Sequence, residues 1–193
     1  VLPLIKKIRE TSLAPISVDT YYPEVAEAAI QAGATMINDI KGLDTLGMAE
    51  VLAQYHEVQV VIMHSRKRQS LSLKEELHQF YTEKIEQCQK YGLSLEKICF
   101  DPGIGFHKTV AENLQLLKDP NAFRYQDYPL LYGVSRKRTI GALTNEPEPA
   151  NRDFGSAAAS VYAAQQGVEI LRVHNVKGLK QTFDVWRALS EKE

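Results

Sequence analysis

The sequence lacks several features that would assign a function class directly. It has only two cysteines, Cys88 and Cys99, with no C-x-x-C pair, so neither a disulfide framework nor a cysteine metal site is indicated. No apolar run approaches the roughly 20 residues that cross a membrane, and no secretory signal is recognisable. No G-x-G-x-x-G follows a strand-like run, and no G-x-x-x-x-G-K-[ST] occurs. These absences exclude the usual nucleotide-binding fingerprints and favour a cytoplasmic location.

Net charge is also nearly absent. Lysine and arginine number 23 against 24 acidic residues, giving a formal charge of -1. No whole-protein field therefore attracts nucleic acid or an acidic membrane. The basic clusters 66–68 and 136–138 are short, so any anion binding is expected to be local. With 193 residues, 44% of them hydrophobic, the chain is large enough for a core, and we predict one domain over residues 1–193.

Apolar, β-branched runs alternate with amphipathic helical patterns. Strands are predicted at 15–19, 35–38, 58–63, 97–100, 129–134 and 169–173. Helices are predicted over 24–32, 47–55, 73–91, 111–118, 153–166 and 177–189. Residues Leu4, Ile5 and Ile8 also have helical spacing. Six strand-then-helix units indicate a parallel sheet covered on both faces, which leaves a doubly wound open sheet and a (β/α)8 barrel as alternatives.

The helix over 73–91 carries the clearest local signals. Ser72 and Glu75 form a capping box, and Gly92 stops the helix. One apolar stripe at helical spacing indicates the core face, and its members are Leu73, Leu77, Phe80, Tyr81, Ile85 and Cys88.

Nearly every predicted strand ends in polar side chains. These are Asp19, Asn38, Asp39, His64, Asp101, Ser135, Arg136, Lys137, Arg172 and His174. Because the carboxyl ends of parallel strands share one edge, we expect these groups to converge there. Such a ring of polar groups requires a partner to satisfy it.

The segment "DPGIGF" (101–106) combines an acid with backbone freedom. Pro102 biases Asp101 to an extended backbone, while Gly103 and Gly105 permit tight turning or close approach by a ligand. A carboxylate in such a site pairs well with an amidine-like edge through two parallel hydrogen bonds. Together with Asp19 and Asn38, it suits a flat heterocycle rich in N–H and C=O groups.

The later strand ends suit anions. Residues 135–137 read as a strand end turning into a helix, whose free N–H groups favour a carboxylate or phosphate. Arg172 and His174 flank Val173 at period two, so they are expected on one side of a strand, facing another anion. Three structural alternatives stay open: Lys137 and Arg138 as solvated helix surface, His174 as a structural hydrogen-bonding residue, and Asp39 as a cap or a residue that supports a ligand-binding neighbour.

Six segments, in order, resemble the dihydropteroate synthase family: "ISVDT" (16–20), "GATMINDI" (33–40), "VIMH" (61–64), "DPGIGF" (101–106), "GVSRKRTIG" (133–141) and "RVHNV" (172–176). The resemblance implies a (β/α)8 TIM-barrel fold, of which this chain holds the last six of eight βα units. It also implies a transferase of folate biosynthesis. Such an enzyme joins 6-hydroxymethyl-dihydropterin pyrophosphate to p-aminobenzoate, giving dihydropteroate and pyrophosphate.

The resemblance also implies roles for individual residues. The pterin would bind to Asp19, Asn38, Asp101 and Lys137. The p-aminobenzoate would bind to Ser135, Phe106 and Lys137, and the pyrophosphate to Arg172 and His174. Lys137, Arg172 and His174 would be catalytic. The family implies Mg²⁺, with no ligand for it from this chain, small-molecule substrates without nucleic acid or membrane, and a homodimer.

Departures from the family pattern set further expectations. Asn175 stands where the family has aspartate, and the segment 65–70 is unlike its relatives. The family's "N-x-T-P-D-S-F" and "G-G-E-S-T" type loops are expected upstream of Ile16, so we expect little activity, instability or self-association from this chain alone. The alternatives are an inactive pterin-binding module, a pterin-dependent methyltransferase relative, against which "GVSRKR" and "RVH" argue, and a phosphosugar barrel enzyme.

Overall fold

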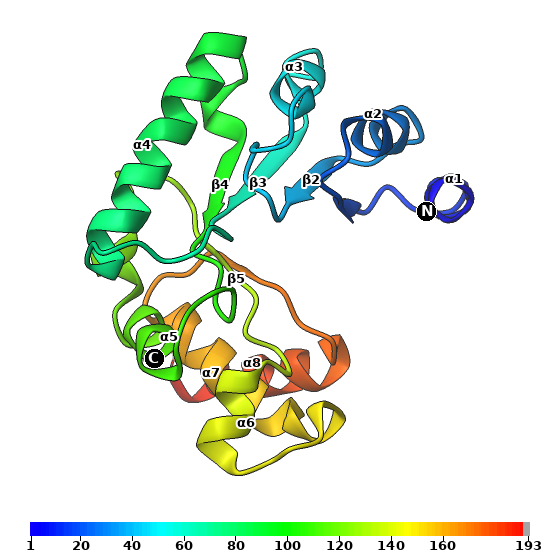
Figure 1. Ribbon diagram of the computed structural model, residues 1–193. Coiled ribbons are helices and arrows are strands. Elements are labelled where there is room, and N and C mark those ends of the chain that lie inside the picture. Colours follow the sequence, from blue (N-terminus) through cyan, green and yellow to red (C-terminus); the bar gives the residue numbers. More distant parts are fainter. Residues whose placement is uncertain (191–193) are drawn as a thin grey trace. The chain divides into compact units, whose positions relative to one another are not determined.

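The computed structural model describes residues 1–190, and its strands and helices follow the predicted alternation (Figure 1). These residues divide into two compact units. The first comprises Val1–Asp101 with Tyr125–Tyr128, and the second comprises Pro102–Arg124 with the described residues from Pro129 onward. None of the described helices is both long enough and apolar enough to cross a membrane. The single domain predicted over 1–193 stays a prediction.

The first unit is built on a parallel sheet. Its strands are β1 (Ser17–Asp19), β2 (Met36–Asp39), β3 (Gln59–Met63) and β4 (Ile98–Asp101), paired in that order. Helices α2 (Pro23–Gln31), α3 (Met48–Leu52) and α4 (Leu73–Tyr91) lie along one side of it (Figure 1). Helix α1 (Leu2–Arg9) packs against α2, and a 3-10 turn over Leu95–Lys97 leads into β4.

The strand register divides the side chains of this sheet between two faces. Asp19 pairs with Asn38, Asn38 with Val61, and Val61 with Cys99, so these residues share one face. Asp101 follows Cys99 by two residues and therefore lies on the same face. The other face includes Phe100, whose ring lies 4.2 Å from that of Tyr81 on α4. The helices therefore cover the face opposite Asp19, Asn38 and Asp101.

Helix α4 begins and ends where its sequence predicts. The Ser72–Glu75 capping box forms, and Gly92 closes the helix with a left-handed φ of 78°. The predicted stripe is buried apart from Ile85, which is half-buried, and the charged residues Glu76 and Lys84 are buried as well. On this face, Tyr125 and Tyr128 add their rings at 6.1 and 5.4 Å from Phe100.

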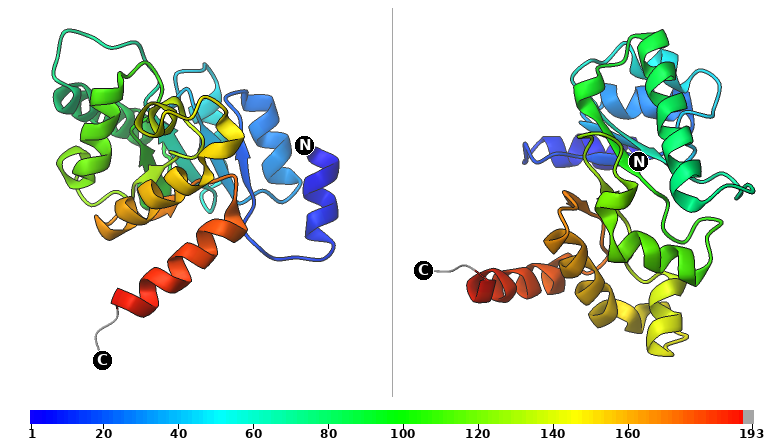
Figure 2. Two further views of the ribbon diagram at one scale, coloured as in Figure 1. Left: turned by 90° about the horizontal axis from the view of Figure 1, so that it is seen from below. Right: turned by 90° about the vertical axis from the view of Figure 1, so that its left-hand side faces the viewer.

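The second unit pairs β5 (Leu131–Tyr132) with β6 (Ile170–Leu171) in parallel. Its helices are α5 (Val110–Lys118), α6 (Arg138–Thr144), α7 (Asp153–Gln165) and α8 (Val176–Ser190), with 3-10 turns over Pro120–Phe123 and Pro149–Arg152. Helix α7 packs against α8, as Figure 2 shows. The buried Tyr132 donates its hydroxyl to the carbonyl of Leu116 at 2.9 Å, which ties β5 to α5.

Several predicted boundaries are wrong in extent. The strands predicted at 129–134 and 169–173 form regular pairs over only two residues each, although Leu130 and Val134 beside the first pair are also buried. The helix predicted over 47–55 is limited to Met48–Leu52. The apolar sequence pattern thus located these segments correctly but predicted longer strands and a longer helix than the structure has.

Candidate active site

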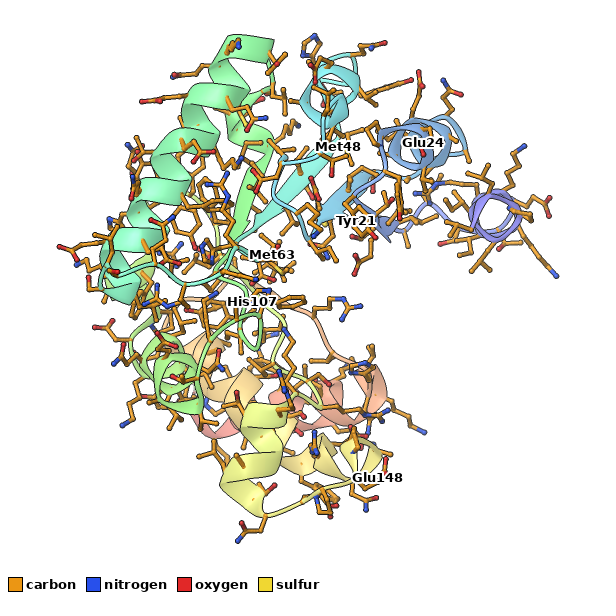
Figure 3. The ribbon with its side chains drawn as sticks, viewed as in Figure 1. Tyr21, Glu24, Met48, Met63, His107 and Glu148 are labelled. Atoms are coloured by element: carbon orange, nitrogen blue, oxygen red, sulfur yellow. The ribbon has the colours of Figure 1, made fainter. Side chains whose placement is uncertain are left out.

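The first unit places three of the predicted pterin-binding residues on one face of its sheet. Asp19 and Asn38 are register neighbours at the ends of β1 and β2. Asp101 ends β4 beside Met63 of β3, which Figure 3 labels. Asp19 is exposed, whereas Asn38 and Asp101 are buried. The arrangement offers carboxylate and amide groups along one edge of the sheet, as a flat polar heterocycle requires.

Asn38 carries an unused hydrogen-bonding atom. Its side chain is 6% exposed, and its Oδ1 atom is buried without a hydrogen-bond partner among residues 1–190. The backbone of Asn38 is held by the sheet and by the N–H of Thr20, which donates to its carbonyl at 3.2 Å. A buried acceptor without a donor costs free energy that a ligand N–H or O–H would recover.

Two polar strand ends point instead to the helix-covered side, so the expectation that all of them converge is wrong for Asp39 and His64. The Asp39 carboxylate accepts from the N–H groups of Lys41 and Leu43, both at 2.8 Å, so it fixes the turn after β2 and has a structural role, as the alternative for this residue predicted. Burial raises the pKa of Asp39, against the effect of these two bonds. His64 Nε2 lies 3.3 Å from Glu76 Oε1 on α4.

A charged network fixes the loop that follows Asn38. The buried Lys84 ammonium donates to Asp44 Oδ1 at 2.6 Å, and Arg66 binds both Asp44 and Glu83 through paired hydrogen bonds. Burial opposes ionisation of Asp44, but the hydrogen bonds from Arg66 and Lys84 outweigh it and hold the pKa of Asp44 below its usual value. The sequence pattern missed Lys84, because charge alone predicts a solvated position.

In the second unit, Lys137 and Phe106 come together. The Lys137 ammonium lies 4.8 Å from the centre of the Phe106 ring and also donates to the carbonyl of Ile104. Lys137 is therefore not a solvated surface residue, whereas Arg138 is exposed. An ammonium over an aromatic face forms a shelf on which a second ring can pack. We call Phe106 and Lys137 the ring shelf.

Residues 135–137 lead from β5 into helix α6, as predicted, with Lys137 at the N-cap and Ser135 two residues before it. Helix α6 has seven residues and begins at Arg138, because Arg136 adopts a left-handed φ of 60° and its guanidinium binds Asp153 at 2.7 and 2.9 Å. The buried Ser135 hydroxyl accepts from the backbone N–H of His174 at 3.2 Å and lies 2.9 Å from its Nδ1.

The predicted pyrophosphate residues follow a short strand. Strand β6 ends at Leu171, so Arg172 and His174 lie beyond it, and both are exposed. The N–H of Arg172 donates to the carbonyl of Tyr132 at 3.0 Å, and Ser135 holds His174. The backbone of Arg172 and both the backbone and the ring of His174 are thus held in place, while both residues are exposed to solvent.

Asn175 has a physical reason to be an amide. Its Nδ2 donates to Asp153 at 3.2 Å, while its Oδ1 accepts from the N–H of Gly178 at 2.8 Å near the start of α8. An aspartate could accept the second bond but would repel the Asp153 carboxylate. The hydrogen bond from Arg136, more than that from Asn175, holds the pKa of Asp153 below its usual value.

A magnesium site is not assembled by the described residues. Within residues 1–190, no group of three or more His, Cys, Asp or Glu side chains is placed to hold a metal ion. The requirement for Mg²⁺ therefore stays a prediction, and no chemical step below is assigned to it.

Comparison with known proteins gives matches along nearly the whole chain. The family described as "Pterin binding enzyme" matches residues 1–174. Dihydropteroate synthase of Synechocystis sp. is 37% identical over 196 residues, covering 97% of this chain and 68% of that protein. Its counterpart from Escherichia coli K12 is 37% identical over 202 residues, covering 100% of this chain and 71% of the relative.

Solved structures give the same result. Dihydropteroate synthase of Xanthomonas albilineans in complex with 7,8-dihydropteroate superposes with a TM-score of 0.94 at 38% identity, over 100% of this chain and 75% of that one. The same enzyme with 4-aminobenzoic acid gives the same TM-score and identity, over 71% of its chain.

Proposed function

Since the chain belongs to the dihydropteroate synthase family of pterin-binding enzymes, we propose that it joins 6-hydroxymethyl-dihydropterin pyrophosphate to p-aminobenzoate. The products are dihydropteroate and pyrophosphate. The structural matches also confirm the predicted α/β fold class of the TIM-barrel type. Complexes of a relative with dihydropteroate and with 4-aminobenzoic acid support both the product and the second substrate.

The observation that carries this function to named residues is the polar face of the first unit. We propose that Asp19, Asn38 and Asp101 bind the pterin, whose ring nitrogens supply the N–H donors that carboxylates and amide oxygens accept. The buried, unpartnered Asn38 Oδ1 supports this assignment, because it needs one such donor. Holding the flat ring by several fixed groups aligns its reactive carbon before the reaction.

The second unit supplies the groups for the other reactant and the leaving group. The ring shelf suits the aromatic ring of p-aminobenzoate, and Ser135 is proposed to contact its carboxylate. Lys137 is also proposed to contact the pterin. Arg172 and His174 are proposed to stabilise negative charge as the bond from the pterin methylene carbon to the pyrophosphate oxygen breaks. The aniline nitrogen then forms the new C–N bond and loses one proton.

The decisive experiment is a turnover assay on this chain. Purified protein is mixed with the pterin pyrophosphate and p-aminobenzoate, with and without Mg²⁺, and both pyrophosphate and dihydropteroate are quantified. Binding of the pterin pyrophosphate without turnover would support the inactive-module alternative instead. Methyl transfer to a thiol or cobalt acceptor would support the methyltransferase alternative.

The matched variants test the pterin face separately. Asp101→Asn should weaken pterin binding about tenfold or more, because it removes the charge from a buried ligand contact. The exposed Asp127 provides the control, since Asp127→Asn changes the same chemical group on the surface. Equal affinity in Asp101→Asn and wild type would favour the phosphosugar alternative over the pterin function.

Self-association and cytoplasmic location complete the proposal. An apolar groove of about 1170 Å³ lies between α7 and α8, and Phe154 and Leu189, which line it, are 91% and 82% exposed. A second copy covering this groove would remove apolar surface from water. Light scattering should then give twice the chain mass, and Leu189→Asp should return it to one. The buried free thiols Cys88 and Cys99 support a reducing compartment.

A further inference from the structure

The loop between β4 and α5 has an unusual concentration of left-handed backbone. Gly103, Gly105 and His107 have φ values of 72°, 81° and 48°, and Figure 3 labels His107. Such alternation turns carbonyl and N–H groups in different directions, so a loop of this kind keeps one shape only if those groups are bound. The Phe106 ring of the shelf is carried between two of these residues.

Asn113, in the first turn of α5, hydrogen-bonds to the backbone of this loop. Its side chain is 2% exposed. Its Oδ1 accepts from the N–H of Gly105 at 2.8 Å, and its Nδ2 donates to the carbonyl of Lys108 at 3.4 Å. One buried amide thus joins the residue before Phe106 to the residue two places after it. The Thr109–Glu112 capping box fixes the start of the helix that carries Asn113.

Lys108 closes the same loop from within. Its ammonium donates to the carbonyls of Gly103 and Phe106, both at 3.3 Å. The carbonyl between them in the chain, that of Ile104, accepts from Lys137 of the ring shelf. Two ammonium groups therefore bind successive loop carbonyls, and one of them is itself part of the shelf. Space is tight as well, because a Cβ at Gly105 would lie 3.1 Å from Lys137 Cδ.

We propose that Asn113 and Lys108 are positioning residues that fix the ring shelf for an aromatic amine substrate. They touch the loop and not the substrate, so their effect passes through the placement of Phe106 against Lys137. The identity of the substrate rests on the proposed function, whereas the fixing of the loop does not. Neither residue was singled out by the sequence pattern, because an asparagine inside a helix and a loop lysine have no distinctive spacing.

The test uses the full chain and four variants. Lys108→Met keeps the aliphatic stem without the ammonium, Lys108→Arg restores a cation, and Asn113→Leu removes both amide bonds. Lys118→Met is the control, because Lys118 is an exposed lysine near the end of the same helix. We expect Lys108→Met and Asn113→Leu to raise KM for p-aminobenzoate about five- to tenfold, with KM for the pterin pyrophosphate within about twofold of wild type. Lys108→Arg should recover most of the loss.

Amide hydrogen exchange measures the loop without any substrate. Asn113→Leu should speed exchange of the Gly105 N–H about tenfold or more, relative to amides of the β1–β4 sheet, and Lys118→Met should not. If Lys108→Met and Asn113→Leu turn over as fast as the wild type and keep its KM values, the positioning role is overturned. An equal rise in both KM values, or the same rise in Lys118→Met, would also overturn it.

The two proposals fail in different ways. Absence of both binding and turnover in wild type would refute the proposed function, and the exchange measurement would then decide the fixing of the loop by itself. Unchanged Gly105 exchange in Asn113→Leu would refute that fixing whether or not the wild type is active. If Asn113→Leu does not fold, Lys108→Met and its arginine rescue still decide the outcome, because Lys108 is only half-buried.

Discussion

Replacing Asn38 by leucine should increase stability while it weakens ligand binding. The two residues branch at the same carbon, so Asn38→Leu changes polarity more than shape. In the described chain the Asn38 Oδ1 is buried and has no donor, which costs about 1–3 kcal/mol for a buried polar group. Carbonyl oxygens tolerate missing partners better than N–H groups do, so we expect a gain of about 1 kcal/mol in the free energy of unfolding.

Binding should change in the opposite direction. A pterin N–H that donates to Asn38 Oδ1 would face a methyl group in Asn38→Leu, and its lost hydrogen bond would cost about 1–3 kcal/mol. That cost corresponds to about a 5- to 150-fold rise in Kd. Functional sites commonly hold such polar groups at the expense of stability.

Urea denaturation and calorimetric titration with 6-hydroxymethylpterin measure the two effects. Asp39→Leu is the matched control at the next position, where both carboxylate oxygens already accept backbone N–H groups. It should destabilise the chain by about 3 kcal/mol, because two N–H donors lose their acceptors. A loss of more than about 1 kcal/mol in Asn38→Leu, or an unchanged Kd, would show that the argument from the unpartnered oxygen is wrong.

Four further predictions concern the first unit. Asp44→Ala should lower the free energy of unfolding by about 2 kcal/mol, because it leaves the buried Lys84 ammonium without its main partner. In urea melts this loss should exceed that of Lys84→Met by at least about 1 kcal/mol. Equal losses in the two variants would contradict the argument. Since the folded pKa of Asp44 is lowered, its contribution is present above the unfolded pKa and is lost as pH falls through the folded pKa, so the Asp44→Ala difference should shrink in acid melts near pH 3. Ser72→Ala removes the side-chain cap of α4 and should lower the free energy of unfolding by about 1 kcal/mol. Thermal melts check this, with Ser72→Thr, which keeps a capping hydroxyl, as the control. Burial raises the pKa of Cys88 to about 12, and Cys99 is buried as well. Ellman's reagent at pH 8 should therefore label neither thiol until urea unfolds the chain. Rapid labelling of the native protein would refute this.

Local signals were enough to predict much of the fold. Helix α4 was predicted from Leu73 to Tyr91 because its capping box and its terminal glycine act within a few residues of the ends they fix. The short strands β5 and β6 were overextended, since the sequence shows that Val134 is apolar but not whether a neighbouring backbone pairs with it. Propensity describes one segment, whereas pairing depends on two.

The candidate site was predictable in its residue types but not in its directions. The polar strand ends were visible in the sequence, yet Asn38 and Asp39 are adjacent and therefore point to opposite faces of β2. The helices cover one face of the sheet and leave the other open to a ligand. Tertiary packing decides which face that is, and hence which of the two side chains can contact a ligand. Likewise, the left-handed turn at Arg136 depends on Asp153, which lies 17 residues further along the chain.

The resemblance to a known family supplied roles that residue patterns could not. Asn175 illustrates the limit in the other direction, because comparison with a family motif marks it only as a departure. Its two hydrogen bonds, to Asp153 and from Gly178, explain why an amide fits there. Chemistry at one position becomes interpretable once its neighbours in space are known.

The segment Tyr125–Tyr128 has a consequence for synthesis of the chain on the ribosome. It belongs to the first unit, where Tyr125 and Tyr128 lie against Phe100, although the rest of that unit ends at Asp101. A nascent chain therefore cannot complete its first aromatic core until residue 128 has emerged. By then all of α5, from the second unit, has already been translated. The two units should thus acquire their structure in overlapping periods, and not one after the other as separate nascent domains do.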